Sequence, residues 1–418
     1  MRNPTPLALV ALLASAAVSA QPVAVVPTLE TQPSGGATGN NLRDVALWVN
    51  PTDGGTSLLI TAYDTTVGAG LATFGLDGRL VETDLTIGPT RAVAVRDGFP
   101  LADSVQTLAV VSNTTFNGLT AYTLDSLGTA RLIRLSDSSF IRGNINAVAL
   151  YRSSVSGRFY AFAGTQGGLE QFELSGTDGG VTATSVRTLE TGRGLITGLV
   201  ADEDTGNLFV MEEGSGLWRY GAEPDAGSDR RQVAPADGGP LVSAVGRVAL
   251  YRARNNEGYL IAADQDDDAF DVFERRSLAF VGSFQVVQDG GIDAVEAPLS
   301  LAVASRPVGA GFPDGVFVAH DSQSTPDNLK LVPWPSVATA FDPDLRIDTQ
   351  ADTDGGTDGG TDAGDPDAGP VIQPPPPPPN PVPPQDGDGC SCASASVPAT
   401  ALLGLVALVL AGRRRRRS

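Results

Sequence analysis

The stretch Val148-Ala149-Leu150-Tyr151 returns as Val248-Ala249-Leu250-Tyr251 further along the chain. Related apolar stretches occur as Val45-Ala46-Leu47-Trp48, Val93-Ala94-Val95-Arg96, Leu199-Val200-Ala201-Asp202 and Leu301-Ala302-Val303-Ala304. Successive copies lie about fifty residues apart, and a fixed spacing of this length is the sequence signature of a fold built from repeated units. We therefore expect one structural unit to recur six times between residues 21 and 347.

Each copy contains further strand patterns after this apolar stretch. A turn rich in glycine, aspartate and serine leads to a second apolar run, such as Leu208-Phe209-Val210-Met211. Residues 168–174 then alternate apolar and polar side chains, which is typical of a half-buried strand. With one more variable outer strand, each unit becomes a four-stranded blade. The sequence thus predicts an all-β fold, a six-bladed β-propeller with four-stranded antiparallel blades.

The expected fold also predicts where function lies. The first strand of each blade lines the central channel of a propeller, so the residues just before it surround one mouth of that channel. Those residues are Arg43-Asp44, Arg91-Ala92, Asn146-Ala147, Thr197-Gly198, Gly246-Arg247 and Leu299-Ser300. Only Asp44 in this ring is acidic, whereas three of its positions carry arginine.

The two ends of the chain predict export and anchoring. Residues 1–20 combine Arg2, an apolar run and small residues before Gln21, which is typical of a cleaved signal peptide. Residues 348–389 form a linker of Asp, Gly and Thr repeats followed by prolines, with no capacity for a core. Residues 390–418 contain Cys390-Ser391-Cys392, a short apolar transmembrane helix and an arginine cluster. This order resembles the C-terminal sorting signals of myxobacterial surface proteins, and the alternative is an ordinary single-span tail anchor.

Composition limits the chemistry of the chain. A net charge of −20 disfavours nucleic acid, and we expect membrane contact only through the C-terminal anchor. The single histidine, His320, argues against Ser-His-Asp, Cys-His and multi-histidine zinc sites. The acidic balance suits calcium, although it equally keeps an exported protein soluble. We expect a monomer without disulfides in its folded body.

Several stretches resemble the β-propeller phytases, in order along residues 41–338. The first is Asp44-Val45-Ala46-Leu47-Trp48-Val49-Asn50-Pro51, and the last is Asn328-Leu329-Lys330-Leu331-Val332-Pro333-Trp334. Between them the resemblance is carried by residues 70–78, 111–113, 161–174, 198–203, 212–224, 258–275 and 312–319. The resemblance implies a calcium-dependent phosphomonoesterase of the 3-phytase type, which acts on inositol phosphates through carboxylates around the channel mouth.

The chain departs from that family pattern at the residues that would carry the activity. Thr197 stands where the family has a glutamate, and residues 244–247 and 295–300 have lost its acidic motifs. Thr114 and Thr165 replace basic residues that hold phosphate. The remaining catalytic candidates, Asp44, Glu212 and Glu213, are too few for a calcium cluster, which needs six to eight oxygens per ion. We therefore expect weak or lost activity; the alternative is a non-catalytic surface module that binds an anionic ligand or a protein.

Two further groups of charged residues are candidates for binding. Arg43, Arg91 and Arg247 could bind an anion such as an inositol phosphate, or could instead pair with acids such as Asp44. Asp264, Asp266 and Asp268 alternate as in a calcium loop, but lack the glycine and distal glutamate of an EF-hand. The acids at 202–204 are expected to cap backbone amides at a hairpin turn.

Overall fold

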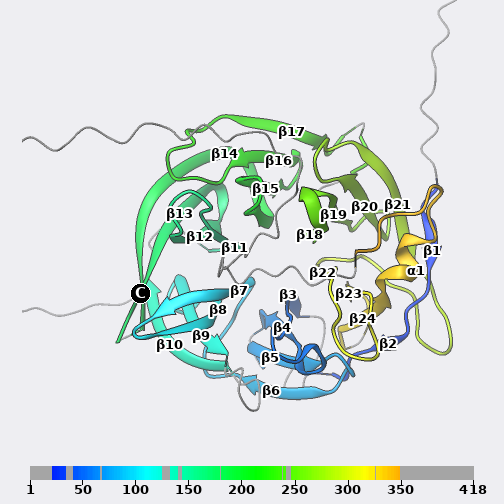
Figure 1. The fold of residues 1–418 in the computed structure, drawn as a ribbon, viewed down its shortest axis with the longest axis horizontal. Helices are drawn as coiled ribbons and strands as arrows, with labels where there is room; N and C mark the ends of the chain where they lie inside the picture. Colours follow the sequence, from blue (N-terminus) through cyan, green and yellow to red (C-terminus); the bar gives the residue numbers. More distant parts are fainter. Residues whose placement is uncertain are drawn as a thin grey trace, which may run out of the picture. The chain divides into compact units, whose positions relative to one another are not determined.

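Antiparallel strands make up nearly all the regular structure in the computed structural model of the chain (Figure 1). The structure describes residues 21–348, except 34–40, 66–67, 125–131, 140–143, 179, 238, 242–245 and 325. The predicted signal peptide and C-terminal segment, and the linker beyond Asp348, therefore lie outside the described residues. Within the described ranges no helix is long and apolar enough to cross a membrane.

The strands form sheets that follow one another along the chain. The first contains β3 (Leu42–Trp48), β4 (Leu58–Tyr63), β5 (Gly70–Gly75) and β6 (Leu80–Asp84). The second contains β7 (Val93–Leu101), β8 (Ser104–Asn113), β9 (Gly118–Leu124) and β10 (Leu132–Ser139). Both are antiparallel meanders in which each strand pairs with the next, as expected for propeller blades.

A long strand joins the next two meanders. These are built from β11 (Ala147–Arg152), β12 (Phe159–Gly164), β13 (Gln166–Thr177), β14 (Gly180–Asp202), β15 (Asn207–Glu212), β16 (Gly216–Gly221) and β17 (Arg230–Pro235). The first part of β14 pairs with β13, whereas its last part, from Ile196 to Asp202, pairs with β15. One strand is therefore the outer strand of one meander and the inner strand of the next.

The N-terminal segment completes the last two sheets. One contains β18 (Val248–Arg252), β19 (Gly258–Asp264), β20 (Ala269–Glu274) and β21 (Phe280–Val286), with β1 (Val23–Val25) added in parallel to β21. The other contains β22 (Leu301–Ala304), β23 (Val316–Asp321) and β24 (Asn328–Pro333), with β2 (Leu29–Glu30) as its outer strand. A short helix, α1 (Trp334–Ala338), follows β24.

Side-chain packing closes the ring of sheets. Each hydrophobic cluster among the described residues draws on two neighbouring sheets, and one joins the first sheet to the last through Leu59, Phe74, Val318 and Leu331. The inner strands β3, β7, β11, β14, β18 and β22 also contact one another in this order, and β22 contacts β3. Each buried leucine or phenylalanine contributes roughly 1.5–3 kcal/mol through removal from water, so packing between sheets stabilises the ring.

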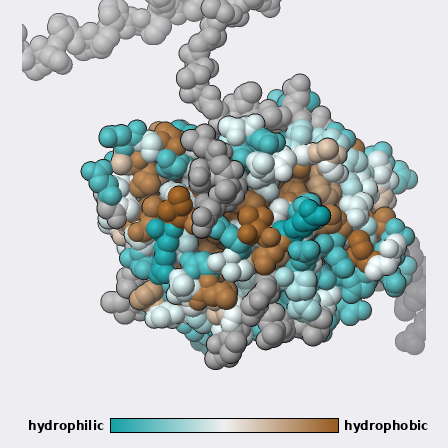
Figure 2. All heavy atoms as spheres, turned by 90° about the horizontal axis from the view of Figure 1, so that it is seen from below, coloured by the Kyte–Doolittle hydropathy of each residue, from teal (hydrophilic) through white to brown (hydrophobic). Residues whose placement is uncertain are grey.

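The predicted fold class is confirmed as all-β with four-stranded antiparallel sheets in a propeller arrangement. Every apolar stretch of the sequence repeat lies in an inner strand. Viewed along one edge, hydrophobic and hydrophilic residues are interspersed (Figure 2). Some large exposed hydrophobic side chains lie on outer strands, including Val81 of β6 and Ile133 of β10, and others lie in turns, such as Val155.

Candidate functional site

Residues at or just before the starts of the repeated apolar stretches converge on Arg247. Its Nη1 donates to the carbonyl oxygens of Asn146, at 2.5 Å, and Thr197. Its Nη2 donates to the carbonyls of Arg91, at 2.5 Å, and Arg43, at 3.3 Å. Its backbone N–H donates to the carbonyl of Leu299 at 2.9 Å. We call this set the strand-start ring: Arg43-Asp44, Arg91, Asn146, Thr197, Arg247 and Leu299-Ser300.

Asp44 is the buried acid of the ring. Its carboxylate accepts hydrogen bonds from the backbone N–H groups of Val45 and Val93, both at 3.0 Å, and from the Ser300 hydroxyl at 2.9 Å. Arg247 Nε lies 3.4 Å from Asp44 Oδ1. Burial raises the pKa of Asp44, and the Arg247 charge and these hydrogen bonds oppose that rise. Burial also lowers the pKa of Arg247, but its guanidinium stays charged.

The local backbone explains this arrangement. The register of β3 against β4 shifts between Leu42 and Asp44, which is a β-bulge that directs Asp44 inward and leaves Arg43 exposed. Gly198 lies against the backbone of Arg247, since a Cβ on Gly198 would stand 3.0 Å from the Arg247 Cα. A glycine at this position therefore permits the close approach that places Arg247 on the axis.

The other two predicted anion-binding arginines have different surroundings. Arg91 Nε lies 2.6 Å from Asp64 Oδ2, and Arg91 Nη1 donates to the side chain of Asn146 at 3.0 Å. Arg43 is exposed, and among the described residues its side chain has no hydrogen-bond or ion-pair partner. Of these three arginines, Arg91 and Arg247 are thus paired with acids, and Arg43 has no partner among the described residues.

The catalytic candidates are not assembled into one acidic centre. Glu212 is buried, its Oε2 lies 3.0 Å from Arg230 Nη1, and its Oε1 accepts from the Gly194 N–H at 3.4 Å. Glu213 is exposed. Neither has a recorded contact with Asp44, so the proposed catalytic roles of these three acids stay predictions.

The predicted calcium loop lies in the turn between β19 and β20. Asp264 is buried and accepts from the Asp266 N–H at 3.3 Å, whereas Asp268 accepts from the Ala297 N–H at 2.6 Å. Across the described part of the chain, no three histidine, cysteine, aspartate or glutamate side chains are placed to hold a metal ion. A calcium site at Asp264, Asp266 and Asp268 therefore stays a prediction.

The strand-start ring does not suit the calcium cluster that the family resemblance implies. Calcium needs several oxygen ligands, largely carboxylates when ions share a site. Here one carboxylate and four carbonyl oxygens converge, and the guanidinium of Arg247 already lies among them. A second cation at this position would meet a buried positive charge at short range, which is strongly unfavourable. The donor set and the charge therefore fit an arginine, and they do not fit a calcium ion.

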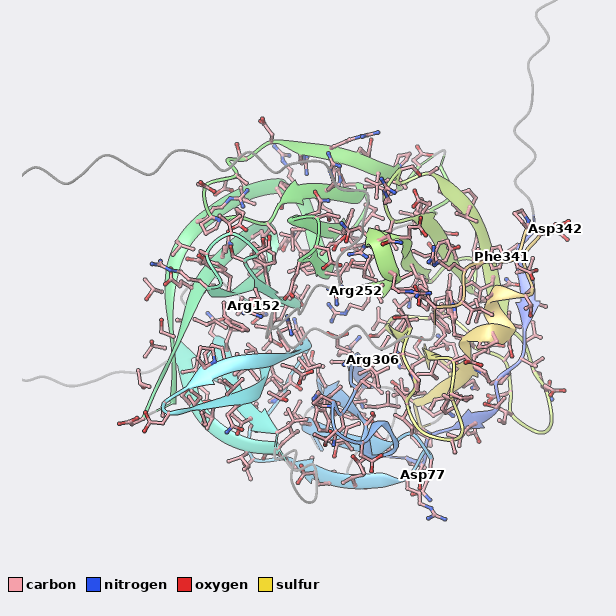
Figure 3. All side chains as sticks on the ribbon, viewed as in Figure 1. Asp77, Arg152, Arg252, Arg306, Phe341 and Asp342 are labelled. Carbon is pink, nitrogen blue, oxygen red and sulfur yellow. The ribbon has the colours of Figure 1, made fainter. Side chains whose placement is uncertain are left out.

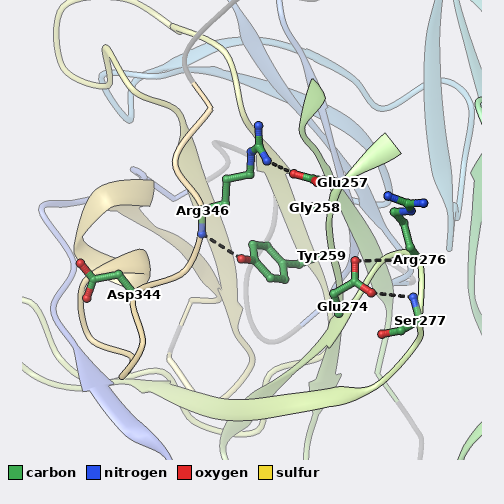
Figure 4. A pocket seen from close by; sticks show the side chains of 8 residues that line it. All are labelled: Glu257, Gly258, Tyr259, Glu274, Arg276, Ser277, Asp344 and Arg346. Carbon is green, nitrogen blue, oxygen red and sulfur yellow. Dashed lines mark hydrogen bonds and ion pairs between the residues drawn. The ribbon is translucent and has the colours of Figure 1, made fainter. Parts of the chain in front are cut away.

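A surface hollow lies away from this ring, beside β19 and β20. It has a volume of about 720 Å³ and is lined by residues that include Glu257, Tyr259, Glu274 and Arg346 (Figure 4). Arg346 forms an ion pair with Glu257, and Glu274 accepts backbone hydrogen bonds from Arg276 and Ser277. Glu257 and Glu274 thus have local partners, and Asp344 is the one lining acid without a hydrogen-bond or ion-pair partner among the described residues.

The acids at 202–204 behave differently from the sequence prediction. They do not simply cap a turn: Asp202 is fully buried and pairs with Arg275 through contacts of 2.5 and 2.9 Å, and Asp204 contacts the same guanidinium at 2.5 Å. The Glu203 carboxylate instead accepts hydrogen bonds from Nε and Nη2 of Arg96, both at 2.8 Å. The partners are remote in sequence, so no local pattern could have revealed these ion pairs.

Comparisons with known proteins agree with this architecture. A family model described as Phytase matches residues 5–355. The chain is 32% identical over 327 residues to a 3-phytase of Bacillus subtilis (strain 168), and the match covers 74% of this chain and 84% of that protein. The family match spans the described sheets and the strand-start ring.

Proposed function

Because this chain belongs to the phytase family, we propose that it is a phytase-like propeller whose calcium-dependent phosphomonoesterase activity is weak or lost. The relative's name denotes a 3-phytase, which makes inositol phosphates the substrates to test. The observation that carries the proposal is the position of Arg247. Its guanidinium satisfies the oxygens at the strand-start ring, where a hydrolytic calcium centre would need them free.

The second candidate function is a non-catalytic binding module at the cell surface. Two observations favour it over hydrolysis: Asp44 is enclosed by hydrogen bonds, and Glu212 is paired with Arg230. A general base or a metal ligand needs a free, reachable oxygen. Export and anchoring are proposed from residues 1–20 and 390–418 of the sequence. In this function the propeller binds an anionic ligand or a protein.

Phosphate release from inositol hexakisphosphate tests the proposal. The full chain is assayed with calcium and with a chelator, beside the Bacillus subtilis 3-phytase as a positive control. We expect release far below that of the positive control in both conditions. Calcium-dependent turnover comparable to that of the control, lost in an Asp44→Asn variant, would refute the proposal and would support a catalytic role of Asp44.

A further inference from the structure

We propose that the opposite mouth of the propeller channel is a binding site for a small organic anion with a short aliphatic tail. The inference deepens the binding function proposed above and rests on it. The site is built by residues at the ends of the repeated apolar stretches or one or two residues after them: Arg96, Arg152, Glu203, Arg252 and Arg306. We call them the strand-end mouth. Figure 3 shows Arg152, Arg252 and Arg306 around the centre of the ring.

Specific contacts place these residues at one mouth. Arg252 Nη2 donates to the carbonyl of Ala201, near the end of β14, at 2.8 Å. Arg306 Nη2 donates to the carbonyl of Val49, just after β3, at 3.3 Å. The backbone N–H of Arg152 donates to Glu203 Oε1 at 2.9 Å. Three different sheets therefore contribute a guanidinium to the same end of the channel.

The guanidinium groups of this mouth retain unused donors. No hydrogen bond from the Arg152 guanidinium is recorded within the described ranges, where it lies 5.7 Å from the Phe159 ring. Arg252 uses one nitrogen, and Arg306 has one hydrogen bond and a distant ion pair with Asp97 at 3.9 Å. An arginine fork has five N–H donors, which match carboxylate and phosphate oxygens.

The acids nearby offset only part of the positive charge of the mouth: Asp97 pairs with Arg306, whereas Arg152 and Arg252 have no ion pair among the described residues. Glu203 is held by Arg96 through two bonds of 2.8 Å, and Asp202 is held by Arg275. Asp97 accepts hydrogen bonds from the Trp48 indole at 2.9 Å and the Thr107 hydroxyl at 2.6 Å. The mouth thus concentrates positive charge on a chain whose net charge is −20. Such a local field attracts anions that the rest of the surface repels.

The channel behind the mouth defines the rest of the ligand. A cavity of about 190 Å³ is bordered by the inner strands, with Arg96, Glu203 and Arg252 at one end and Asp44 and Arg247 at the other. Leu47, Val95, Val200 and Val303 line it and remain partly exposed. Partly exposed aliphatic side chains inside a channel favour an apolar ligand group. A ligand with a charged head group at the arginines and a short aliphatic tail in the channel fits both the arginine cluster and the apolar lining.

Calorimetry with three probes tests the site in the full chain at low ionic strength. Hexanoate supplies head and tail, acetate supplies the carboxylate alone, and inorganic phosphate supplies a different anionic head. We expect hexanoate to bind at least tenfold more tightly than acetate, and added salt to weaken binding. Equal affinities for acetate and hexanoate would refute a tail in the channel. Absence of hexanoate binding at millimolar concentration would refute the site.

Matched variants locate the binding. The triple variant Arg152→Gln, Arg252→Gln, Arg306→Gln should weaken hexanoate binding at least tenfold. Its control, Arg79→Gln, Arg231→Gln, Arg276→Gln, removes the same charge from exposed positions outside the channel and should bind within twofold of the parent. Equal loss in both variants would show a general charge effect and would overturn the proposal.

A variant that binds hexanoate more tightly than the parent shows that the changes in affinity do not come from misfolding. Glu203→Gln removes the acid that holds Arg96 and should tighten hexanoate binding about threefold or more, a direction that a damaged fold cannot produce. Weaker binding in this variant would contradict the site. The outcomes also separate the two proposals: phosphate release from inositol hexakisphosphate would refute the loss of activity alone, whereas absent hexanoate binding would refute the strand-end mouth alone.

Discussion

Arg247 Nε lies 3.4 Å from Asp44 Oδ1, and each of these side chains keeps only 10% of its surface exposed. The pair joins the sheet that contains β18 to the sheet that contains β3. Because the guanidinium also binds the carbonyl oxygens of Asn146, Thr197 and Arg91, it links the sheet that contains β18 to the sheets that contain β7 and β11. Arg247 is thus a structural cation at the strand-start ring.

Replacement of Arg247 by methionine should destabilise the protein by about 3–5 kcal/mol, because Asp44 would remain buried without its partner charge. Urea denaturation of the full chain measures the change. Arg79→Met, at an exposed position, should cost less than about 0.5 kcal/mol. The double variant Asp44→Asn, Arg247→Met should cost less than the two single changes together. A cost below about 1 kcal/mol for Arg247→Met would contradict the structural role.

Asp271 predicts a pH dependence of stability. Burial raises the pKa of Asp271 to about 7, the nearby Asp264 and Asp267 add to the rise, and the Ser283 hydroxyl opposes it. The folded state therefore holds a proton that the unfolded chain has lost, so this group stabilises below about pH 4 and its contribution falls as the pH rises to about 7. The total loss is on the order of 4 kcal/mol.

Asp271→Asn isolates this effect, since the amide keeps the shape and does not titrate. The free energy of unfolding of the parent should decrease between pH 5 and pH 8 more steeply than that of the variant. Asp289→Asn, at an exposed turn position, should retain the parental slope. Parallel pH profiles for the parent and Asp271→Asn would show that Asp271 titrates normally.

The fold was predictable because its determinants are local. The apolar stretches of the repeat and the alternation at 168–174 each lie within one strand or hairpin, so a single sequence reveals them. The inner strands at Val45, Val148 and Val248 appear where the repeat predicts. The sequence did not predict that β14 pairs first with β13 and then with β15. No residue in it marks where the outer strand of one meander ends and the inner strand of the next begins.

The site was predictable only in part because its partners are distant in sequence. The sequence identifies Arg247 as an arginine in a position where an acid is expected from the family pattern. It does not reveal that carbonyl groups at 43, 91, 146 and 197 accept hydrogen bonds from that arginine. Carbonyls belong to every residue and leave no pattern. The strand-end mouth was not predictable for a related reason. Arg152 and Arg252 are the last residues of their strands and belong to no known motif.

Calcium should stabilise the protein only weakly. A ligand that binds the folded state alone adds about 2.7 kcal/mol at one hundred times its dissociation constant. With Arg247 at the strand-start ring, we expect saturating calcium to raise Tm by no more than a few degrees relative to the chelated protein. A rise above roughly ten degrees would reveal a strong site. If an Asp264→Asn, Asp266→Asn, Asp268→Asn variant no longer showed this rise in Tm, the site would lie in the predicted loop. Asp289→Asn is the control.

Asp348, which the sequence assigns to the linker, packs against the folded body. Asp348 is buried: its carboxylate accepts from the Arg254 backbone N–H at 2.8 Å, and its own N–H donates to the Tyr251 hydroxyl at 2.9 Å. A chain that ends at residue 350 should therefore unfold with the same free energy as the full chain, within about 0.5 kcal/mol. In that shortened chain, Asp348→Ala should cost about 1–3 kcal/mol, since a buried N–H and the Arg254 guanidinium lose a charged acceptor. Asp344→Ala, at an exposed position nearby, is the control. A shortened chain that lacks a cooperative urea transition would show that the propeller needs residues beyond 350.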